Sequence, residues 1–488
     1  MGDTGVQGFL KAFRELAELA HQQVGHDDGG ERFSAALTAY LGQPAGQVPV
    51  VTETVVGHRF ADWDVALSLL AGRDPQAREL GVGGGESRYH QTLPDFVAGI
   101  HGRFPVGQVD YVSVPTGPDS HRRVIGFGMR LFSYRDQPVG VMQRRANPRF
   151  GMDQATVEVI CPDREVAAAL LDEARELSLE HSVLRGQVVS FESSGFGPES
   201  SGITFLERPT ISADQVILPE RSMERIIAHV VGIAEHADVL RRHGQHLKRG
   251  LLLYGPPGTG KTHTVRHLIS RSPEHTVVVL AGESLAYVSL AATLARALTP
   301  AIVVLEDCDL VAEDRGMSPT GRPLLFEVLD AMDGLDADAD VTFLLTTNRV
   351  ETLERALVQR PGRVDQAVEV PLPDTEGRRR LLELYRGDVP YGDAALADAA
   401  ERSAGMTASF MKELMRRAVL LAAIDGTDPD DAHLRTALDG LLDDQEQLTR
   451  VLLGTGRSGG PEVGPGAQMW EGPGEAEGWE PGFQIGPG

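Results

Sequence analysis

Residues 255–262 read Gly255-Pro256-Pro257-Gly258-Thr259-Gly260-Lys261-Thr262, directly after the apolar run Arg249–Tyr254. This order matches the G-x-x-x-x-G-K-[ST] pattern of a phosphate-binding loop between a strand and a helix. The glycines let successive N–H groups turn toward an anion, and the following helix adds its positive N-terminus. We expect Lys261 to contact the β- and γ-phosphates of a nucleotide and the Thr262 hydroxyl to bind Mg²⁺. A coincidental glycine-rich turn is the alternative, but the expected strand and helix around it weigh against that.

Two adjacent carboxylates, Glu306 and Asp307, follow another apolar run at Ala301–Leu305. A site that hydrolyses a nucleoside triphosphate needs one carboxylate for the Mg²⁺ shell and a second that orients and deprotonates water. Neighbouring residues at the end of a buried strand point to different sides, so the two roles can be divided between these residues. The alternative is an ordinary helix cap at a strand-to-helix turn.

Three further polar residues follow in the order that a nucleotide site requires. The apolar run Val341–Thr346 leads to Asn348, whose amide could hold the attacking water in line. By itself, an asparagine after a strand is only a turn signal. Arg360 and Arg363 flank a Pro-Gly turn, and a guanidinium that reaches a γ-phosphate stabilises charge in the transition state. If a neighbouring subunit supplies it, the active site lies at an interface; the alternative is two solvated surface arginines.

The alternation of apolar runs with helical patterns predicts an α/β fold for residues 206–373. Such a rhythm is typical of a parallel sheet that is covered on both faces by helices. A helix over Ser222–Leu240 is expected before the first strand. The expected strands are Arg249–Tyr254, Thr276–Leu280, Ala301–Leu305, Val341–Thr346 and Gln366–Val370.

Residues 374–453 have helical patterns only, and they predict a small helical lid after the sheet. The expected helices are Glu376–Tyr385, Tyr391–Ser403, Thr407–Asp425 and Pro429–Leu441. The last segment, 454–488, contains 12 Gly and 5 Pro in 35 residues, so we expect it to be disordered. It is expected to be a solvating tail, with Trp470 and Trp479 as anchors of a docking motif as the alternative.

Residues 1–205 carry no strong motif and are interpreted as one α+β domain, with a possible helical arm at 6–24. The helix Arg164–Glu180 is the clearest element, because its apolar residues recur at helical spacing. Expected strands lie at Gln108–Val114, Val124–Tyr134, Thr156–Cys161 and Gln187–Phe191.

Composition excludes several classes of protein. The 488 residues include 70 acidic and 46 basic ones, and a net charge of −24 disfavours sequence-independent binding of nucleic acid. The two cysteines, Cys161 and Cys308, form no disulfide framework, and the 15 histidines show no metal-ligand spacing. No apolar run is long enough to cross a bilayer and no secretory signal is visible, so we expect a cytoplasmic protein without a membrane partner.

Taken in this order, the motifs resemble the AAA family of ring-forming ATPases over roughly Pro209–Leu453. The resemblance implies ATP and Mg²⁺ as cofactors, a homo-oligomeric and usually hexameric ring, and a protein client or adaptor bound through residues 1–205. It assigns the magnesium position to Glu306 beside Thr262, the catalytic position to Asp307, and the arginine fingers to Arg360 and Arg363. Asn348 occupies the first sensor position in this resemblance.

Two further features enter through the resemblance. The lid turn from Gly405 to Ala408 is similar to a family turn that lies near the nucleotide. The order Glu306-Asp307 inverts the usual Asp-Glu, as in the branch that resembles the mitochondrial Bcs1 translocase. Because aspartate is one methylene shorter than glutamate, turnover is expected to be slow.

Family members that thread polypeptides carry an aromatic residue in a pore loop before the carboxylates. Tyr287 is the candidate, although Ser289 stands where glycine is usual. A buried helical tyrosine is the alternative at this position.

Three functions stay open from the sequence. The first is an ATP-driven motor that remodels a macromolecular client, and the second is a slow nucleotide-dependent assembly switch or scaffold. The third, a phosphotransferase of the kinase type, is disfavoured by the two arginines and by the helical lid.

Overall fold

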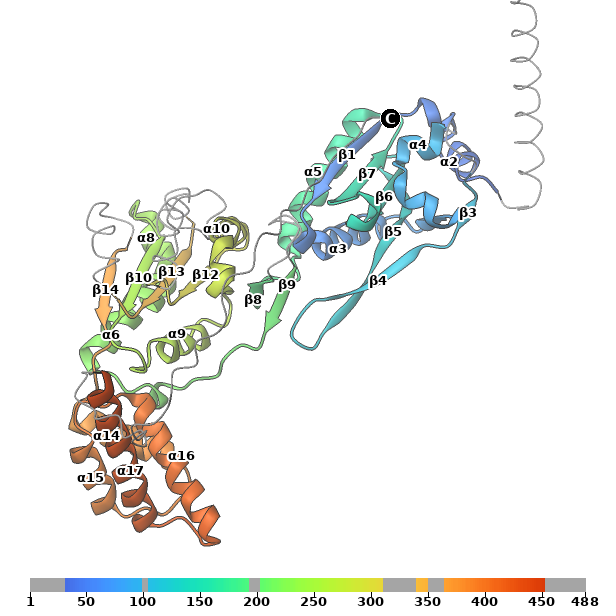
Figure 1. Cartoon of the computed structure of the whole chain (residues 1–488). Helices are drawn as coiled ribbons and strands as arrows, with labels where there is room; N and C mark the ends of the chain where they lie inside the picture. The colour runs from blue at the N-terminus through green and yellow to red at the C-terminus, as the bar shows by residue number, and fades with distance from the viewer. Residues whose placement is uncertain (1–30, 99–103, 193–201, 310–338, 350–363, 453–488) are drawn as a thin grey trace, which may run out of the picture.

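The computed structural model describes residues 31–98, 104–192, 202–309, 339–349 and 364–452, and these form two sheets and a C-terminal helical bundle (Figure 1). The expected arm at 6–24 and the tail at 454–488 lie outside the described residues. Among the described helices, none is long and apolar enough to cross a membrane.

The first sheet is antiparallel and lies in the N-terminal half of the chain. Its strand order is β1-β7-β6-β5-β2-β3, with β4 paired to β5. Three of the expected strands are present here with small shifts, whereas β6 and the helix α3 were not predicted. The strands are β1 (Val50–Val55), β2 (Arg78–Val82), β3 (Val106–Gly107), β4 (Asp110–Pro115), β5 (His121–Tyr134), β6 (Gln137–Arg144) and β7 (Ala155–Ile160).

Helices pack on both faces of this sheet, which explains why β5 is buried along most of its length. One apolar core joins α3 (Phe60–Ala71) and α5 (Arg164–Glu180) to the sheet through residues such as Leu67 and Leu170. The other joins α2 (Phe33–Leu41) and α4 (Leu93–Ala98) to the opposite face. Because buried strands lose the alternation of apolar and polar residues, β6 was hard to recognise from its sequence.

The second sheet has the strand order β14-β10-β13-β12-β11-β8-β9. Its first six strands pair in parallel, while β8 and β9 pair antiparallel at one edge. The α/β prediction is therefore confirmed. The strands are β8 (Val188–Phe191), β9 (Ile203–Leu206), β10 (Arg249–Tyr254), β11 (Thr276–Ala281), β12 (Ala301–Glu306), β13 (Val341–Thr347) and β14 (Gln366–Glu369).

Two features of this half differ from the sequence interpretation. The strands β8 and β9 extend the second sheet, so the expected boundary at 205/206 falls inside β9. The segment expected to be helical over Ser222–Leu240 is helical over almost all of its length, but it is not one continuous α-helix. It is broken into α6 (Glu220–Ile227), a π-helical turn, α7 (Ile233–Glu235) and α8 (Ala237–Arg242).

The buried Arg249 side chain gives a physical reason for the π-helical turn Ala228–Gly232. Its Nη2 donates to the Val230 carbonyl at 3.0 Å, and its Nη1 donates to Asp340 at 2.7 Å. A side-chain donor that competes for a helix carbonyl is a recognised cause of an irregular turn.

Helices cover both faces of the second sheet. The helix α9 (Lys261–Ser270) packs on one face with α6, and α10 (Val288–Ala297) packs on the other. Both helices follow strands whose carboxyl ends lie at the same edge, and this edge is where ligands bind in open parallel sheets.

The C-terminal helices form a separate bundle around their own apolar core (Figure 1). Two of them begin at side-chain caps: Asp374 accepts a hydrogen bond from the Gly377 N–H, and Thr407 accepts one from the Phe410 N–H. The expected lid is thus present as helices. They are α14 (Thr375–Arg386), α15 (Asp393–Arg402), α16 (Ala408–Asp425) and α17 (Asp431–Leu452).

Candidate nucleotide site

The loop 255–260 joins β10 to α9 through a backbone that only glycine adopts easily. Gly255, Gly258 and Gly260 have φ values of +145°, +76° and +106°. A Cβ on Gly255 would lie 2.3 Å from the Val370 carbonyl oxygen, so this position also excludes a side chain by contact. Because no side chains stand in the way at these glycines, the backbone N–H groups of the loop can face an anion at the start of α9.

Lys261 begins α9 and folds back over this loop. Its Nζ donates to the carbonyl oxygens of Gly255 and Pro256, each at 2.9 Å, and the residue is only 6% exposed. Burial lowers the Lys261 pKa, while the carboxylates of Asp307 and Asp309 act in the opposite direction. The ammonium is thus a desolvated donor at the mouth of the phosphate-binding loop.

Glu306 ends β12 and faces α9. Burial raises the pKa of its carboxyl, whereas Arg266 and a hydrogen bond with Thr262 lower it. Arg266 was not predicted as a site residue, although it stands four positions after Thr262 and therefore on the same face of α9. Glu306 and the Thr262 hydroxyl form an oxygen-donor pair beside the loop.

Asp307 turns away from its neighbour. It has a φ of +51°, in the left-handed region that aspartate tolerates better than most residues. Its N–H donates to the Thr346 hydroxyl at 2.9 Å, and its Oδ1 accepts a long hydrogen bond of 3.4 Å from Asn348 Nδ2. The sharp turn directs the two carboxylates to different neighbours, as the division of roles requires.

Asn348 follows β13, and Asp309 fixes its position. The Asp309 Oδ1 accepts from the Asn348 N–H and from the Thr347 hydroxyl, both at 3.1 Å. Asp309 is 6% exposed and was missed in the sequence interpretation. The sequence feature that could have indicated Asp309 is its position as a third carboxylate, two residues after Asp307. The strand pattern alone does not distinguish it from an ordinary turn residue.

The turn before α16 contacts the phosphate-binding loop. Ser409 donates its N–H to the Gly258 carbonyl at 3.1 Å, and a Cβ on Gly258 would lie 3.1 Å from the Thr407 hydroxyl. Gly405 has a φ of +81°, and Ala408 is the first residue of α16. The segment from Gly405 to Ala408 therefore belongs to the lid turn that lies beside the loop.

The remaining candidates have different outcomes. Arg360 and Arg363 lie outside the described residues. Tyr287 is 8% exposed and its ring lies 5.7 Å from that of Phe191, so the structure favours the buried tyrosine over a pore-loop residue. Cys308 is buried, and burial raises the pKa of its thiol to about 12.

The oxygen donors fit Mg²⁺. Mg²⁺ keeps several waters and takes one or two protein ligands together with substrate phosphates. The Thr262 hydroxyl and the Glu306 carboxylate are such a pair, and Glu306 already interacts with Thr262. Across the described residues there is no group of three or more His, Cys, Asp or Glu side chains that could hold a metal by themselves.

A parallel sheet with this loop, these carboxylates and a helical lid defines a P-loop nucleoside triphosphatase. Residues 251–372 match the model of the ATPase family associated with various cellular activities (AAA). The chain therefore contains an AAA ATPase domain, and AAA ATPases use ATP with Mg²⁺.

Similar curated proteins include ATPases and ATP-dependent proteases. The chain is 33% identical over 270 residues to ATP-dependent zinc metalloprotease FtsH 2 of Sphaerobacter thermophilus. The aligned region covers 51% of this chain and 41% of that protein. It is 28% identical over 319 residues to the proteasome-activating nucleotidase of Methanoculleus marisnigri, and the aligned region covers 61% of this chain and 75% of that protein. It is 30% identical over 267 residues to ATP-dependent zinc metalloprotease FtsH of Thermus thermophilus, and the aligned region covers 50% of this chain and 42% of that protein. The chain thus spans only about two-fifths of each of these two FtsH relatives.

Proposed function

We propose that this chain hydrolyses ATP and uses the energy to remodel a protein client. The observation that carries the proposal is the meeting of four elements at one edge of the parallel sheet. Hydrogen bonds join the carboxylates after β12 to the end of β13, and the first turn of α16 to the loop after β10. The interaction of Glu306 with Thr262 connects these two pairs. Such an arrangement couples the occupancy of the phosphate site to the position of the lid.

In the proposed mechanism, Lys261 leaves the loop carbonyls and binds the β- and γ-phosphates. Thr262 and Glu306 would hold Mg²⁺, which would supply positive charge against the phosphates. Asp307 accepts a proton from the attacking water, and Asn348 orients that water and the carboxylate together. This assignment is supported by the opposite surroundings of the two carboxylates: Glu306 interacts with Thr262, and Asp307 interacts with Asn348. It agrees with the inverted order of the Bcs1-like branch, to which we propose the chain is related.

The assembly is part of the same proposal. We propose a homo-oligomeric ring of six subunits, in which Arg360 and Arg363 reach the nucleotide of the adjacent subunit. The part of the chain before β8 recognises the client or an adaptor, and the ATPase subdomain extends from β8 to residue 373. Residues 374–453 form the lid, and 454–488 are the tail. The name of the proteasome-activating nucleotidase supports action on proteins. We propose a cytoplasmic location, where ATP is available and the thiols of Cys161 and Cys308 stay free.

The FtsH relatives are named as metalloproteases, but we do not propose peptidase activity for this chain. None of the 15 histidines is followed by glutamate, so the 488 residues contain no H-E-x-x-H zinc motif. The proposal concerns the ATPase part alone.

A slow assembly switch is the second candidate. It is favoured by Asp307, whose short side chain is held by Asn348 at the end of a left-handed turn. In this case the ring forms on ATP and serves as a scaffold, with little turnover and no threading of a client.

One set of measurements separates these functions. ATP turnover is measured at rising protein concentrations, together with unfolding of a fluorescent client protein and electron micrographs in a slowly hydrolysed ATP analogue. A motor gives rings, cooperative turnover and client unfolding, whereas a switch gives rings and slow turnover without unfolding. Turnover per molecule that is unchanged at a dilution that leaves only monomers would contradict the shared active site.

A further inference from the structure

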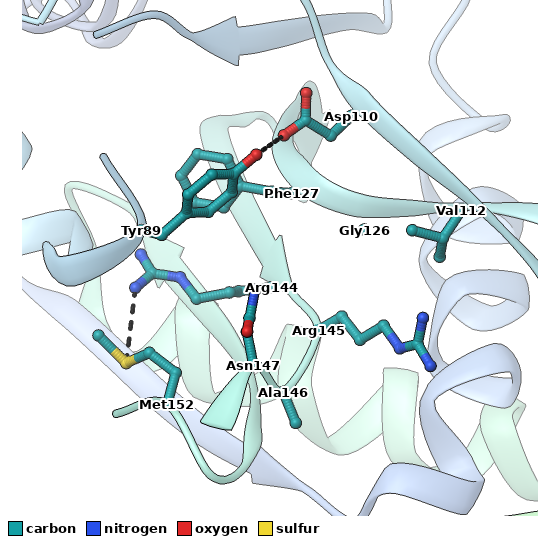
Figure 2. Close-up of a pocket in the computed structure, with 10 residues that line it drawn as sticks. All are labelled: Tyr89, Asp110, Val112, Gly126, Phe127, Arg144, Arg145, Ala146, Asn147 and Met152. Atoms are coloured by element: carbon teal, nitrogen blue, oxygen red, sulfur yellow. Dashed lines mark hydrogen bonds between the residues drawn. The ribbon is translucent and has the colours of Figure 1, made fainter. Parts of the chain in front are cut away.

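The N-terminal domain contains a cavity of about 350 Å³ that no part of the ATPase mechanism uses. It opens between β4, β5 and the end of β6, and the helical turn η3 (Gly85–His90) supplies one wall. Figure 2 shows Tyr89 and Phe127 on one side and the loop that follows Arg144 below them. The residues that the argument uses are Tyr89, Asp110, Phe127, Arg144 and Met152.

Arg144 is the unusual member of this cavity, because its guanidinium is buried without good acceptors. The residue is 4% exposed, and its Nε has no hydrogen-bond partner among the described residues. Its Nη1 donates to the Met152 sulfur, at 3.9 Å. Its Nη2 lies 3.8 Å from the Met142 sulfur and 3.6 Å from the Glu158 carboxylate. Sulfur is a weak acceptor, so a buried cation here lacks most of the hydrogen bonds that it can make.

The two carboxylates near the cavity each accept hydrogen bonds from other groups. The Asp110 Oδ2 accepts from the Tyr89 hydroxyl and from Arg88, both at 2.8 Å. Glu158 accepts from the Leu93 N–H at 3.0 Å, on the side of the sheet core. Its other carboxylate oxygen, Oε2, makes no hydrogen bond among the described residues and lies 3.6 Å from Arg144. The cations that line the cavity are Arg144, which is buried with an unpartnered Nε, and the exposed Arg145.

Aromatic rings form an apolar surface next to this cation. The Arg144 Cζ lies 5.1 Å from the centre of the Phe127 ring, and the Tyr89 ring stacks on Phe150 with centres 5.1 Å apart. A flat apolar group gains by packing against such rings, while an oxyanion gains most from a desolvated guanidinium.

We propose that this cavity binds a carboxylate that is attached to an aromatic or aliphatic group, with Arg144 as its anchor. Two sources of this chemistry exist: a small carboxylic acid, or the C-terminal residue of a polypeptide. The proposal does not depend on ATP hydrolysis, so it can fail or succeed separately from the proposed function.

The test uses the full chain and two pairs of matched ligands. The small pair is N-acetylphenylalanine and its amide, and the peptide pair is a ten-residue peptide that ends in phenylalanine with a free or an amidated C-terminus. Calorimetry and ligand-observed NMR should show binding of the free carboxylate with a Kd on the order of 1 mM or tighter. The amides should bind at least about tenfold more weakly, because the charge-assisted hydrogen bonds are lost.

Variants locate the binding. Arg144→Met should abolish binding, whereas the exposed Arg123→Met, on the same sheet but outside the cavity, should leave it unchanged. Because Arg144→Met leaves Glu158 unpaired, the double variant Arg144→Met/Glu158→Gln removes both buried charges and provides a second folded protein.

Each outcome decides the matter. Binding of both free carboxylates supports the site with polypeptide ends as ligands, and binding of the free acid alone supports it with a small acid. Absence of binding, equal binding of the amides, or binding that survives in both Arg144 variants overturns the proposal and leaves Arg144 with Glu158 as a structural ion pair.

Discussion

The side-chain amide of Asn348 donates to the carboxylate of Asp307 across 3.4 Å, and this contact joins the ends of β13 and β12. The two residues are 41 positions apart in the chain. They meet because β12 and β13 pair in parallel, with Leu305 opposite Leu345, so their carboxyl ends lie at one edge. Water held at this edge would be in contact with both a base and an amide.

Asp307→Asn is expected to keep ATP binding and to reduce hydrolysis by about 10² to 10⁴-fold. The amide preserves the shape of the side chain but cannot accept a proton at neutral pH. Single-turnover hydrolysis and binding of a fluorescent nucleotide measure the two effects separately. Glu306→Gln is the comparison, since it should weaken the Mg²⁺ dependence first. If Glu306→Gln alone stops hydrolysis with binding intact, the roles of the two carboxylates are reversed.

Lys261→Ala should abolish detectable ATP binding, because the phosphates lose a desolvated cation at the loop. Equilibrium binding of a fluorescent ATP analogue measures this loss. Lys412→Ala, in the lid, removes the same charge elsewhere and is the control. Undiminished binding in Lys261→Ala would show that the nucleotide does not occupy this loop.

Asp309→Ala tests the positioning role that the structure adds. Without the carboxylate, the Asn348 N–H and the Thr347 hydroxyl lose their acceptor, and Asn348 is no longer held beside Asp307. We expect kcat to fall by about tenfold or more with little change in KM, since the ground-state contacts of ATP are kept. Asp309→Asn keeps one acceptor oxygen and should restore part of kcat. A change in KM alone, or equal loss in both variants, would contradict a positioning role.

Arg363→Ala should reduce hydrolysis by about 10³ to 10⁵-fold if this arginine acts on the nucleotide of a neighbouring subunit. Mixing the variant with Lys261→Ala subunits, which supply an intact Arg363 but bind no ATP, should recover part of the activity. Turnover at several mixing ratios measures the recovery. Absence of recovery at every ratio would place the arginine within its own subunit or outside the reaction.

His58 is expected to make stability depend on pH. Burial, with Arg59 nearby, lowers its pKa to about 4 from an ordinary value near 6.5. The unfolded chain binds the extra proton first, so the contribution of neutral His58 is complete above pH 6.5 and is lost as the pH falls from about 6.5 to 4. The slope is at most about 1.4 kcal/mol per pH unit for one group.

The matched variant is His58→Phe, which keeps a ring against Phe191. Because His229, His263 and His275 also have lowered pKa values, the informative quantity is the difference in unfolding free energy between wild type and variant at each pH. This difference should change between pH 6.5 and 4 and stay constant from pH 7 to 8. A difference that is constant throughout would mean that His58 titrates normally in the folded protein.

Local sequence patterns were sufficient for the phosphate-binding loop, the central parallel strands and one N-terminal helix. A loop whose backbone N–H groups face an anion needs glycines, and the loop 255–262 contains them. Apolar runs of five or six residues between helices predict buried parallel strands. The helix Arg164–Glu180 was located with its correct ends because Asp163 caps it and its apolar spacing is regular. These features depend on neighbours in the chain, so the sequence shows them directly.

Contacts between distant segments could not be read in this way. The attachment of β8 and β9 to the second sheet depends on edge pairing with β11, and the break after Ile227 depends on the side chain of Arg249. Asp309 becomes a site residue only because β13 ends beside it. The cavity around Arg144 depends on strands and turns that carry no motif.

The sequence by itself determined the phosphate-binding loop, the order of strand and helix, and the residue types that the chemistry needs, because each follows from spacing along one segment. Only the tertiary structure decided which carboxylate faces Thr262, which residue holds Asn348, and that Tyr287 is buried. Side-chain direction at a strand end is set by the backbone turn and by the strand alongside, and neither is encoded in the few residues that form the motif.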